Sequence, residues 1–201
     1  MLYNYMKLTF SVDSRFEEAR MLTNSYIAPI YYGCLSFATI DHFIAYHKYY
    51  EVDKEFSYQF TRGSLNYVGD DAQKVRLMTN GSRWNRVLQH GRRKSTSVNA
   101  NYTPGWDEKK HEDMVRKALK LKFDQHIKIK RVLLNTPSSV QLIHSTKNGG
   151  KWGMCYQKTP TGRIQVGENM LGVMLMELRE EYKKEGIHTF FKEELRTVFD
   201  I

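Results

Sequence analysis

Two short blocks of this sequence hold residue types that can bind an anion and transfer protons. In the first block, Thr39 is predicted to cap a helix that runs to about Tyr50 and places Asp41, His42 and Lys48 near its start. A helix N-terminus exposes unpaired N–H groups and a partial positive charge, which suit a phosphate or a developing negative charge. An acid, a base and a cation are therefore predicted to lie beside an anion site.

The second block lies nearer the C-terminus and also contains a predicted helix start. The clearest helix of the sequence runs from about Glu168 to Lys184, directly after Gly167 and with Asn169 in its first turn. One face of this helix is apolar and is expected to pack in the core: Met170, Leu171, Met174, Leu175 and Leu178. The N-terminus of this helix exposes a second set of unpaired N–H groups, and Glu168 adds a carboxylate beside them.

The segments around these blocks predict a mixed fold. Residues 1–38 are rich in tyrosine, phenylalanine and β-branched types with turn signals, which indicates short strands. Apolar residues at helical spacing predict one helix from Asp107 to about Leu134, ended by Pro137. We therefore expect an α+β, helix-rich single domain over residues 1–201, with an inserted loop or lid at about 60–105.

Composition limits the class of protein. Of the 201 residues, 41% are hydrophobic and 13% are aromatic, which excludes a disordered chain. No apolar run approaches the roughly 18 residues of a membrane span, and the first residues lack the order of a signal peptide. We therefore expect a cytoplasmic protein, in the host cytoplasm if the source is viral. Cys34 and Cys155 match no zinc spacing and are expected to be free thiols, and neither a metal nor a cofactor is predicted.

The charge favours phosphate-bearing partners. The chain has 31 Lys and Arg residues against 22 Asp and Glu residues, a net charge of +9. Five basic residues surround Trp84 between Arg83 and Lys94, and this mixture of cations and a stacking ring is typical of nucleic-acid binding. A solvated basic loop has the same composition, so both interpretations stay open.

Taken in order along the chain, these residues resemble the NADAR family, the YbiA-like N-glycosidases associated with NAD and ADP-ribose. That family has a Ser-Asn-Phe block, a Pro-Ile pair, and a helix that starts with aromatic-Pro-Thr-Ser-Glu-His and ends with Gln-Ala-Gln-Lys. The matching segments here are Thr23-Asn24, Pro29-Ile30, Phe37–His42, Tyr46–Lys48, Ala118-Leu119, Lys122-Phe123, Gln125-His126, Leu142, Thr146, Trp152-Gly153, Asn169–Gly172 and Leu175–Arg179. They are collinear over roughly residues 22–182, with a gap near 60–105 and a smaller insertion at 155–166.

The resemblance implies a YbiA-like fold in which the two blocks form one pocket that binds a phosphorylated ribosyl base and cleaves or recognises its N-glycosidic bond. Substrates of the family include ribosylamino intermediates of riboflavin synthesis and ADP-ribose attached to guanine. Because the bond breaks with positive charge on the ribose, a carboxylate can stabilise it or activate water while an acid or cation assists the departing base. The predicted catalytic residues are Asp41, Lys48 and Glu168. The predicted ligand-binding residues are Asn24, His42, Arg83, Trp152, Gly153, Gly167 and Asn169.

Several acidic residues of the family are replaced in this chain. Asp41 stands where the family has Glu, and His144, Gly149 and Met154 stand at positions that are usually acidic. A shorter carboxylate side chain can be misplaced by about 1 Å, which costs about a hundredfold in rate. Catalytic activity is therefore left open by the sequence.

Three functions remain. The first is an N-glycosidase, with ADP-ribosyl-guanine hydrolase as the leading prediction. The second is a catalytically weak protein that binds or sequesters an ADP-ribose-like nucleotide. The third is a nucleic-acid-binding protein that uses residues 83–94. The expected partner is an ADP-ribose-like or phosphorylated nucleoside ligand, free or as part of ADP-ribosylated DNA or RNA, and no membrane is involved.

Overall fold

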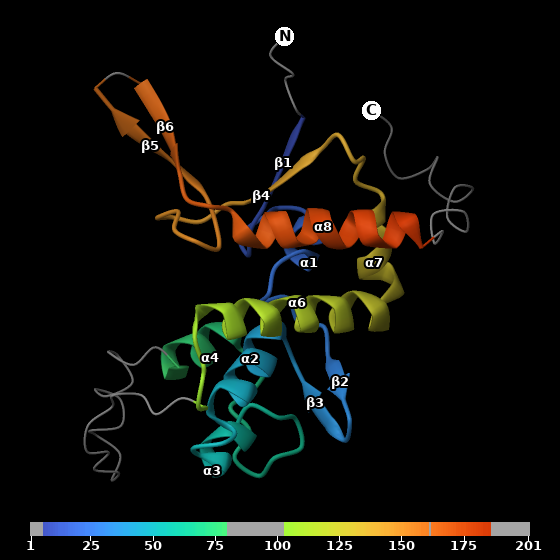
Figure 1. The fold of residues 1–201 in the computed structure, drawn as a ribbon, viewed down its shortest axis with the longest axis vertical. Coiled ribbons are helices and arrows are strands. Elements are labelled where there is room, and N and C mark those ends of the chain that lie inside the picture. The colour runs from blue at the N-terminus through green and yellow to red at the C-terminus, as the bar shows by residue number, and fades with distance from the viewer. Residues whose placement is uncertain (1–5, 80–102, 161, 186–201) are drawn as a thin grey trace. The chain divides into compact units, whose positions relative to one another are not determined.

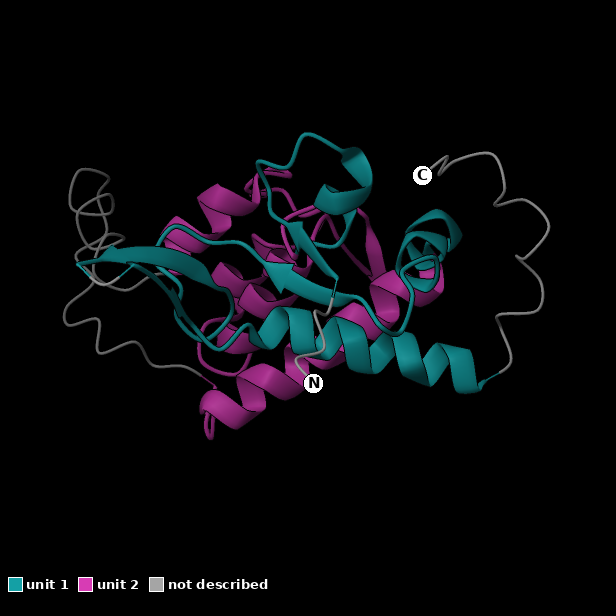
Figure 2. Cartoon of the chain, turned by 90° about the horizontal axis from the view of Figure 1, so that it is seen from above, with its two compact units in different colours: residues 1–23, 126–201 teal, residues 24–125 magenta. Residues whose placement is uncertain are grey.

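A computed structural model describes residues 6–79, 103–160 and 162–185 of the chain (Figure 1). The chain divides into two compact units, which Figure 2 colours separately. Unit 1 contains residues 1–23 and 126–201, and unit 2 contains residues 24–125. Helices and short strands occur in both units.

Unit 2 is built around helix α2 (Ile40–Tyr49). A hairpin of β2 (Ile30–Tyr32) and β3 (Leu35–Phe37) leads into this helix. Three further helices of the unit pack against α2: α3 (Lys54–Tyr58), α4 (Ala72–Thr79) and α6 (Glu108–Gln125). Figure 1 shows the long helix α6 beside α2.

Helix α2 starts where the sequence predicts it. Thr39 has an extended backbone (φ −145°, ψ 170°), and its side chain accepts a hydrogen bond from the N–H of His42, as an N-cap does. Aromatic rings then fix the helix against β3, because Phe37 lies edge-on to Phe43 and Tyr46 with ring centroids 5.2 and 5.3 Å apart. The residues in the first turn of α2 are held by this cap and this packing.

Unit 1 combines segments from both ends of the chain. Strand β1 (Lys7–Phe10) pairs in parallel with β4 (Gln141–His144). Helices α1 (Glu17–Met21) and α7 (Ile127–Leu134) pack together, and α8 (Met170–Lys184) packs against β4 and α7. Strands β5 (Cys155–Thr159) and β6 (Gly162–Val166) form an antiparallel hairpin that pairs with no other strand in the part of the chain that the structure describes.

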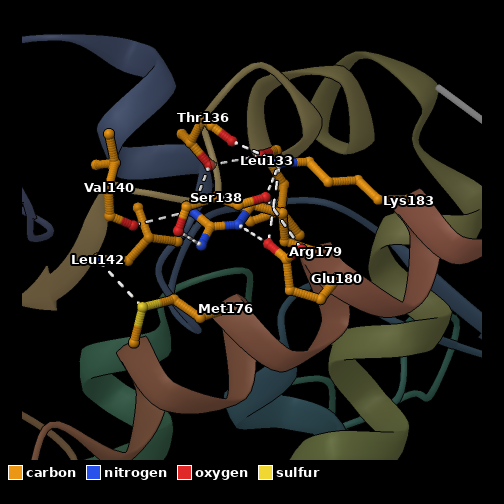
Figure 3. A network of polar contacts seen from close by, with 9 residues as sticks. All are labelled: Leu133, Thr136, Ser138, Val140, Leu142, Met176, Arg179, Glu180 and Lys183. Atoms are coloured by element: carbon orange, nitrogen blue, oxygen red, sulfur yellow. Dashed lines mark hydrogen bonds and ion pairs between the residues drawn. The ribbon is translucent and has the colours of Figure 1, made fainter.

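A buried arginine ties α8 to the segment before β4 (Figure 3). Arg179 is 2% exposed, and its guanidinium donates hydrogen bonds of 3.0 to 3.2 Å to Oγ1 of Thr136 and to the carbonyls of Val140 and Ser138. Its Nε pairs with Glu180 at 2.9 Å. Because the planar guanidinium satisfies several acceptors at once, this buried charge serves the packing of unit 1.

The fold class is the helix-rich α+β class that the sequence predicts, with seven helices and six short strands in the described residues. The prediction of one helix over residues 107–134 is wrong, because His126 has an extended backbone (φ −124°, ψ 90°) and separates α6 from α7. Helix α8 begins at Met170, two residues later than predicted, since Gly167 (φ 114°) and Asn169 (φ 56°) are in left-handed conformations.

Two predicted insertions have different outcomes. Residues 155–166 form the hairpin of β5 and β6. The described part of the segment at 60–105 contains α4, whereas residues 80–102 lie outside the described residues, so the lid stays a prediction. Helix α1, within residues 1–38, was not predicted from the sequence.

Candidate functional site

The main cluster of titratable groups lies at the start of α2 in unit 2. Asp41 occupies the first turn of this helix and is partly buried, and its Oδ2 accepts a hydrogen bond of 2.8 Å from the hydroxyl of Ser25. The neighbouring backbone is joined to the helix because the N–H of Ile40 donates to the carbonyl of Asn24 at 3.1 Å. Residues 24–25 and α2 together position the carboxyl group of Asp41.

A buried lysine from α6 belongs to the same cluster. Lys122 is 0% exposed, and its Nζ lies 5.6 Å from the ring centroid of Tyr26. It occupies the buried face of α6, whose other buried residues are Val115, Ala118, Leu119 and Phe123. Taking an ammonium group out of water costs several kcal/mol, so a lysine at such a position marks a candidate for function.

Burial shifts the pKa values of both groups toward their neutral forms. Burial raises the pKa of Asp41, and the positive charge of Arg76 and the hydrogen bond from Ser25 offset only part of this shift. Burial lowers the pKa of Lys122 to about 7, while the charge of Asp41 acts in the opposite direction. An amine with a pKa near 7 is well matched to proton transfer at neutral pH.

A carboxamide oxygen in the same segment has no partner in the described part of the chain. Oδ1 of Asn24 is buried and accepts no hydrogen bond from the described residues. A buried acceptor without a partner costs free energy, so folded proteins usually satisfy such an atom with water or a ligand. Asn24 is therefore available to accept a hydrogen bond from a ligand hydroxyl or amine.

His42 connects the start of α2 to the loop between α3 and α4, which contains Gly69. Its Nε2 lies 2.8 Å from the carbonyl oxygen of Gly69, so Nε2 carries the proton, and Nδ1 accepts a hydrogen bond of 2.9 Å from the hydroxyl of Thr39. Burial lowers the pKa of His42, which favours this neutral form. An ion pair between Arg62 and Asp70 closes the same loop. Both ring nitrogens of His42 are engaged with the protein, and its ligand contact stays a prediction.

Lys48 lies on the same face of α2 as Asp41, two helical turns later. Seven residues of α-helix separate the two backbone positions by about 10 Å. Lys48 is partly buried, and burial lowers its pKa. The Nζ of Lys48 lies 5.7 Å from the ring centroid of Tyr49. This spacing suits the predicted roles, in which Lys48 binds phosphate while Asp41 acts at the ribose.

The start of α8, in unit 1, uses its N–H groups for the protein itself. The N–H groups of residues 168–171 donate to the carbonyls of residues 150–153 at distances of 2.9 to 3.4 Å. A phosphate at a helix start would bind these same groups. In this conformation the N–H groups are already bonded to the carbonyls of the loop at residues 150–153. The side chain of Glu168 is exposed. Its catalytic role stays a prediction.

Asn169 joins α8 to β4. It is 2% exposed; its Oδ1 accepts a hydrogen bond of 2.8 Å from the N–H of His144, and its Nδ2 donates one of 2.8 Å to the carbonyl of Leu142. Both ends of the carboxamide are therefore used for structure, in contrast to the free acceptor of Asn24.

Glycines allow the loop before α8 to pack closely. A Cβ on Gly153 would lie 2.2 Å from the side chain of Thr146, and one on Gly167 would lie 2.2 Å from the carbonyl oxygen of Gly153. Trp152 is partly buried, and its carbonyl accepts a hydrogen bond of 3.0 Å from Nδ1 of His144. The structure thus gives these residues packing roles, and their ligand contacts stay predictions.

Sequence reasoning did not include Lys122 among the site residues. The available signal was a lysine on the apolar stripe of a predicted helix, three and four residues after Leu119 and Ala118. Arg83 lies outside the described residues. Asp41 and Asn169 belong to different units, so their shared pocket also stays a prediction.

Three further features of the described residues concern metal ligands, thiols and membrane-spanning helices. No group of three or more His, Cys, Asp or Glu residues that could hold a metal ion occurs in residues 6–79, 103–160 and 162–185. Cys34 and Cys155 are free thiols, as predicted. Within the same ranges, no helix is both long and apolar enough to cross a membrane.

The chain is similar to a known family over most of its length. The model of the NADAR domain matches residues 3–183. The N-glycosidase YbiA of Shigella flexneri serotype 5b (strain 8401) is 38% identical over 91 residues, which are 45% of this chain and 49% of that protein. The N-glycosidase YbiA of Escherichia coli (strain K12) is 37% identical over the same shares of both chains. The chain thus spans about half the length of the curated relatives it matches.

A solved structure extends this similarity to the fold. The NMR structure of the E. coli protein YbiA matches with a TM-score of 0.60 and 24% identity, and covers 91% of this chain and 88% of that chain. At this identity the likeness establishes a YbiA-like fold alone.

Proposed function

This chain belongs to the NADAR family, and from that premise we propose that it is an N-glycosidase that hydrolyses the bond between a base and a phosphorylated ribose. The observation that carries the proposal is that α6 packs on α2 and buries Lys122, whose charge and that of Asp41, in the first turn of α2, act on each other. The names of the curated relatives, N-glycosidase YbiA, support the same class of reaction.

The two groups fit complementary steps of the hydrolysis. As the bond from the ribose C1′ to the base breaks, its electrons pass to the base and positive charge develops on the ribose. The ionised Asp41 stabilises that charge and accepts a proton from the attacking water, whose oxygen bonds to C1′. The ammonium group of Lys122 donates a proton to the departing base. Water is thus divided between the two products.

We propose ADP-ribose attached to guanine as the substrate. Lys48 supplies a cation for the diphosphate, and Asn24 supplies an acceptor for a ribose hydroxyl or a base amine. The net charge of +9 favours such an anion near the protein. ADP-ribose and free nucleoside phosphates also carry phosphates and hydroxyls that these residues can bind. A comparison of substrates with different attached bases therefore tests the preference for guanine.

The main test is the change of Asp41 to Asn. This substitution keeps the volume of the side chain and removes its charge. Release of guanosine from ADP-ribosylated guanosine, measured by mass spectrometry, should therefore fall at least about tenfold, since a positioned acid or base contributes about 10²- to 10⁴-fold. Asp113→Asn, on the exposed side of α6, is the matched control and should leave turnover unchanged. Equal turnover in the Asp41 variant and the wild type would exclude the role of Asp41.

The alternative function is sequestration of an ADP-ribose-like nucleotide without hydrolysis. It is favoured by the replacement of family acids at His144, Gly149 and Met154 and by the raised pKa of Asp41, which reduces the ionised fraction. A thermal-shift series distinguishes the two functions. ADP-ribose at a hundredfold excess over its Kd stabilises the folded protein by about 2.7 kcal/mol in both cases, but base is released only by an enzyme. Flat melting curves with ADP-ribose, NAD and nucleoside monophosphates would reject both functions.

A further inference from the structure

The hairpin of β5 and β6 is the most exposed regular element of unit 1. Tyr156 is 55% exposed and Ile164 is 48% exposed, although they lie on opposite faces of the two-stranded ribbon. In Figure 1 the hairpin extends away from β4 and α8. Both faces are therefore accessible, and the hairpin contributes little to the core of unit 1.

The pairing register places four hydrogen-bond donors on one face of this ribbon. Tyr156 lies opposite Gln165, and Lys158 lies opposite Arg163. Residues directly opposite each other, and residues two apart on one strand, share a face. All four residues are exposed to solvent. This donor face carries two cations, an amide and an aromatic ring with a hydroxyl.

The two cations of the donor face have no counter-charge among the residues that the structure describes. Lys158 and Arg163 are direct cross-strand partners, an arrangement that destabilises a hairpin when the charges are alike. Neither forms an ion pair with any described residue. The strands of the hairpin, residues 155–159 and 162–166, contain no Asp or Glu, and the next acid along the sequence is Glu168. Packing therefore does not explain this pair of charges.

We propose that the donor face of the β5–β6 hairpin binds the phosphate backbone of duplex DNA. The major groove of B-DNA, about 12 Å wide, admits a two-stranded β-ribbon, whereas the major groove of A-form RNA is too narrow for side chains to read. Two phosphates neutralise Lys158 and Arg163. Tyr156 and the remaining N–H of the Gln165 amide, whose Nε2 also donates to Sδ of Met154, donate to backbone or base-edge oxygens. An acidic protein fits less well, since a protein interface has an apolar centre and this face has only one ring. The inference does not depend on the proposed enzymatic function.

The test measures binding of a fluorescein-labelled, unmodified 20-base-pair DNA by fluorescence anisotropy between 50 and 200 mM NaCl. The variant with Lys158→Gln and Arg163→Gln should bind at least about tenfold more weakly at 50 mM salt. Loss of two phosphate contacts should also reduce the slope of log K against log salt concentration by about 1.8. The control with Lys109→Gln and Lys184→Gln removes the same charge from other exposed sites and should retain the wild-type slope.

Two further measurements separate binding from folding. Lys158→Glu places opposite charges across the hairpin, so its Tm should equal or exceed that of the wild type while its DNA affinity falls. Tyr156→Ala should weaken binding without a change in the salt slope. Absence of binding to DNA by the wild type at 50 mM NaCl, equal losses in the hairpin and control variants, or tighter binding to duplex RNA or polyglutamate would each overturn the proposal. Because unmodified DNA is used, these outcomes are independent of the release of guanosine from ADP-ribosylated guanosine.

Discussion

The starts of α2 and α8 contrast in how they use the polar groups around a helix N-terminus. At α2, Asp41 is held by one hydroxyl, Lys122 is buried beside it, and Oδ1 of Asn24 has no partner among the described residues. At α8, the first N–H groups and the carboxamide of Asn169 are all bonded to the protein. The first site retains capacity for a ligand, whereas the second joins elements of unit 1.

The difference shows that similar sequence signals can have different physical roles. Both blocks combine a helix start, an Asn residue and an acid, and both match positions of the NADAR family. Before α8, Gly149, Gly153 and Gly167 lie too close to neighbouring atoms for a Cβ, and the loop that they form places its carbonyls against the N–H groups of residues 168–171. At α2 the approaching segment brings the side chains of Asn24 and Ser25. A helix start is therefore a ligand site only if tertiary contacts leave its donors or its neighbours unused.

The largest effect should follow from Lys122→Met. Removal of a positioned acid or base lowers turnover by about 10²- to 10⁴-fold, and a buried apolar side chain of similar length avoids the cost of burying a charge. We therefore expect base release to fall within that range while the Tm stays equal or rises. Single-turnover base release and thermal melting measure both quantities. Lys120→Met, on the half-exposed side of the same helix, should change neither by much; a similar loss in both variants would contradict the assignment.

Asn169→Ala should instead act on stability. It leaves the buried carbonyl of Leu142 and the N–H of His144 without partners, each at a cost of about 1 to 3 kcal/mol. We expect the free energy of unfolding in urea to fall by about 3 kcal/mol, with turnover per folded molecule close to wild type. Asn148→Ala, on the exposed surface of the neighbouring loop, is the control. A loss of turnover without a loss of stability would return α8 to the list of ligand sites.

The pH dependence of stability provides a third comparison. The pKa of Lys122 is about 7 in the folded protein, below its ordinary value of 10.5. Between these values the unfolded chain holds a proton that the folded protein has lost, so this group makes stability rise with pH, by at most about 1.4 kcal/mol per pH unit. Between pH 7 and pH 9, the free energy of unfolding in urea should increase more for the wild type than for Lys122→Met. Parallel curves would mean that burial does not lower this pKa.

Asp41 contributes with the opposite sign at acidic pH. Its raised pKa means that the folded protein holds a proton that the unfolded chain loses as the pH rises above 3.8. The free energy of unfolding of the wild type should therefore fall as the pH rises from 3.8 toward the raised pKa of Asp41. The Asp41→Asn variant should show no such fall when both proteins are unfolded with urea in acetate buffers. No matching difference is expected for Asn169→Ala, which changes no titrating group.

The smallest effect should come from the cap of α2. Thr39→Ala removes an acceptor for the N–H of His42 and a donor for its Nδ1, and loss of an N-cap side chain costs about 1 kcal/mol. Thr39→Ser retains both groups and should recover most of the stability measured by urea unfolding. If the alanine variant is as stable as the wild type, the start of α2 is held by aromatic packing alone.

Much of the local structure of this protein is predictable from its sequence. The apolar stripes of α6 and α8 and the cap at Thr39 follow from spacing and residue type. These signals are local, because a period of 3.6 residues or a capping oxygen involves neighbours a few positions apart. The break at His126 was missed, since the helical pattern of apolar residues continues across it.

The sequence by itself determined the family, the fold class and the candidate acid at Asp41. Only the tertiary structure decided which polar groups remain for chemistry. Lys122 is 81 positions from Asp41, and only the packing of α6 on α2 buries it and lowers its pKa. The N–H groups at the start of α8 are bonded because a loop 16 to 19 residues upstream returns to them. Burial and hydrogen bonding depend on contacts distant in sequence, so residue type and spacing cannot specify them.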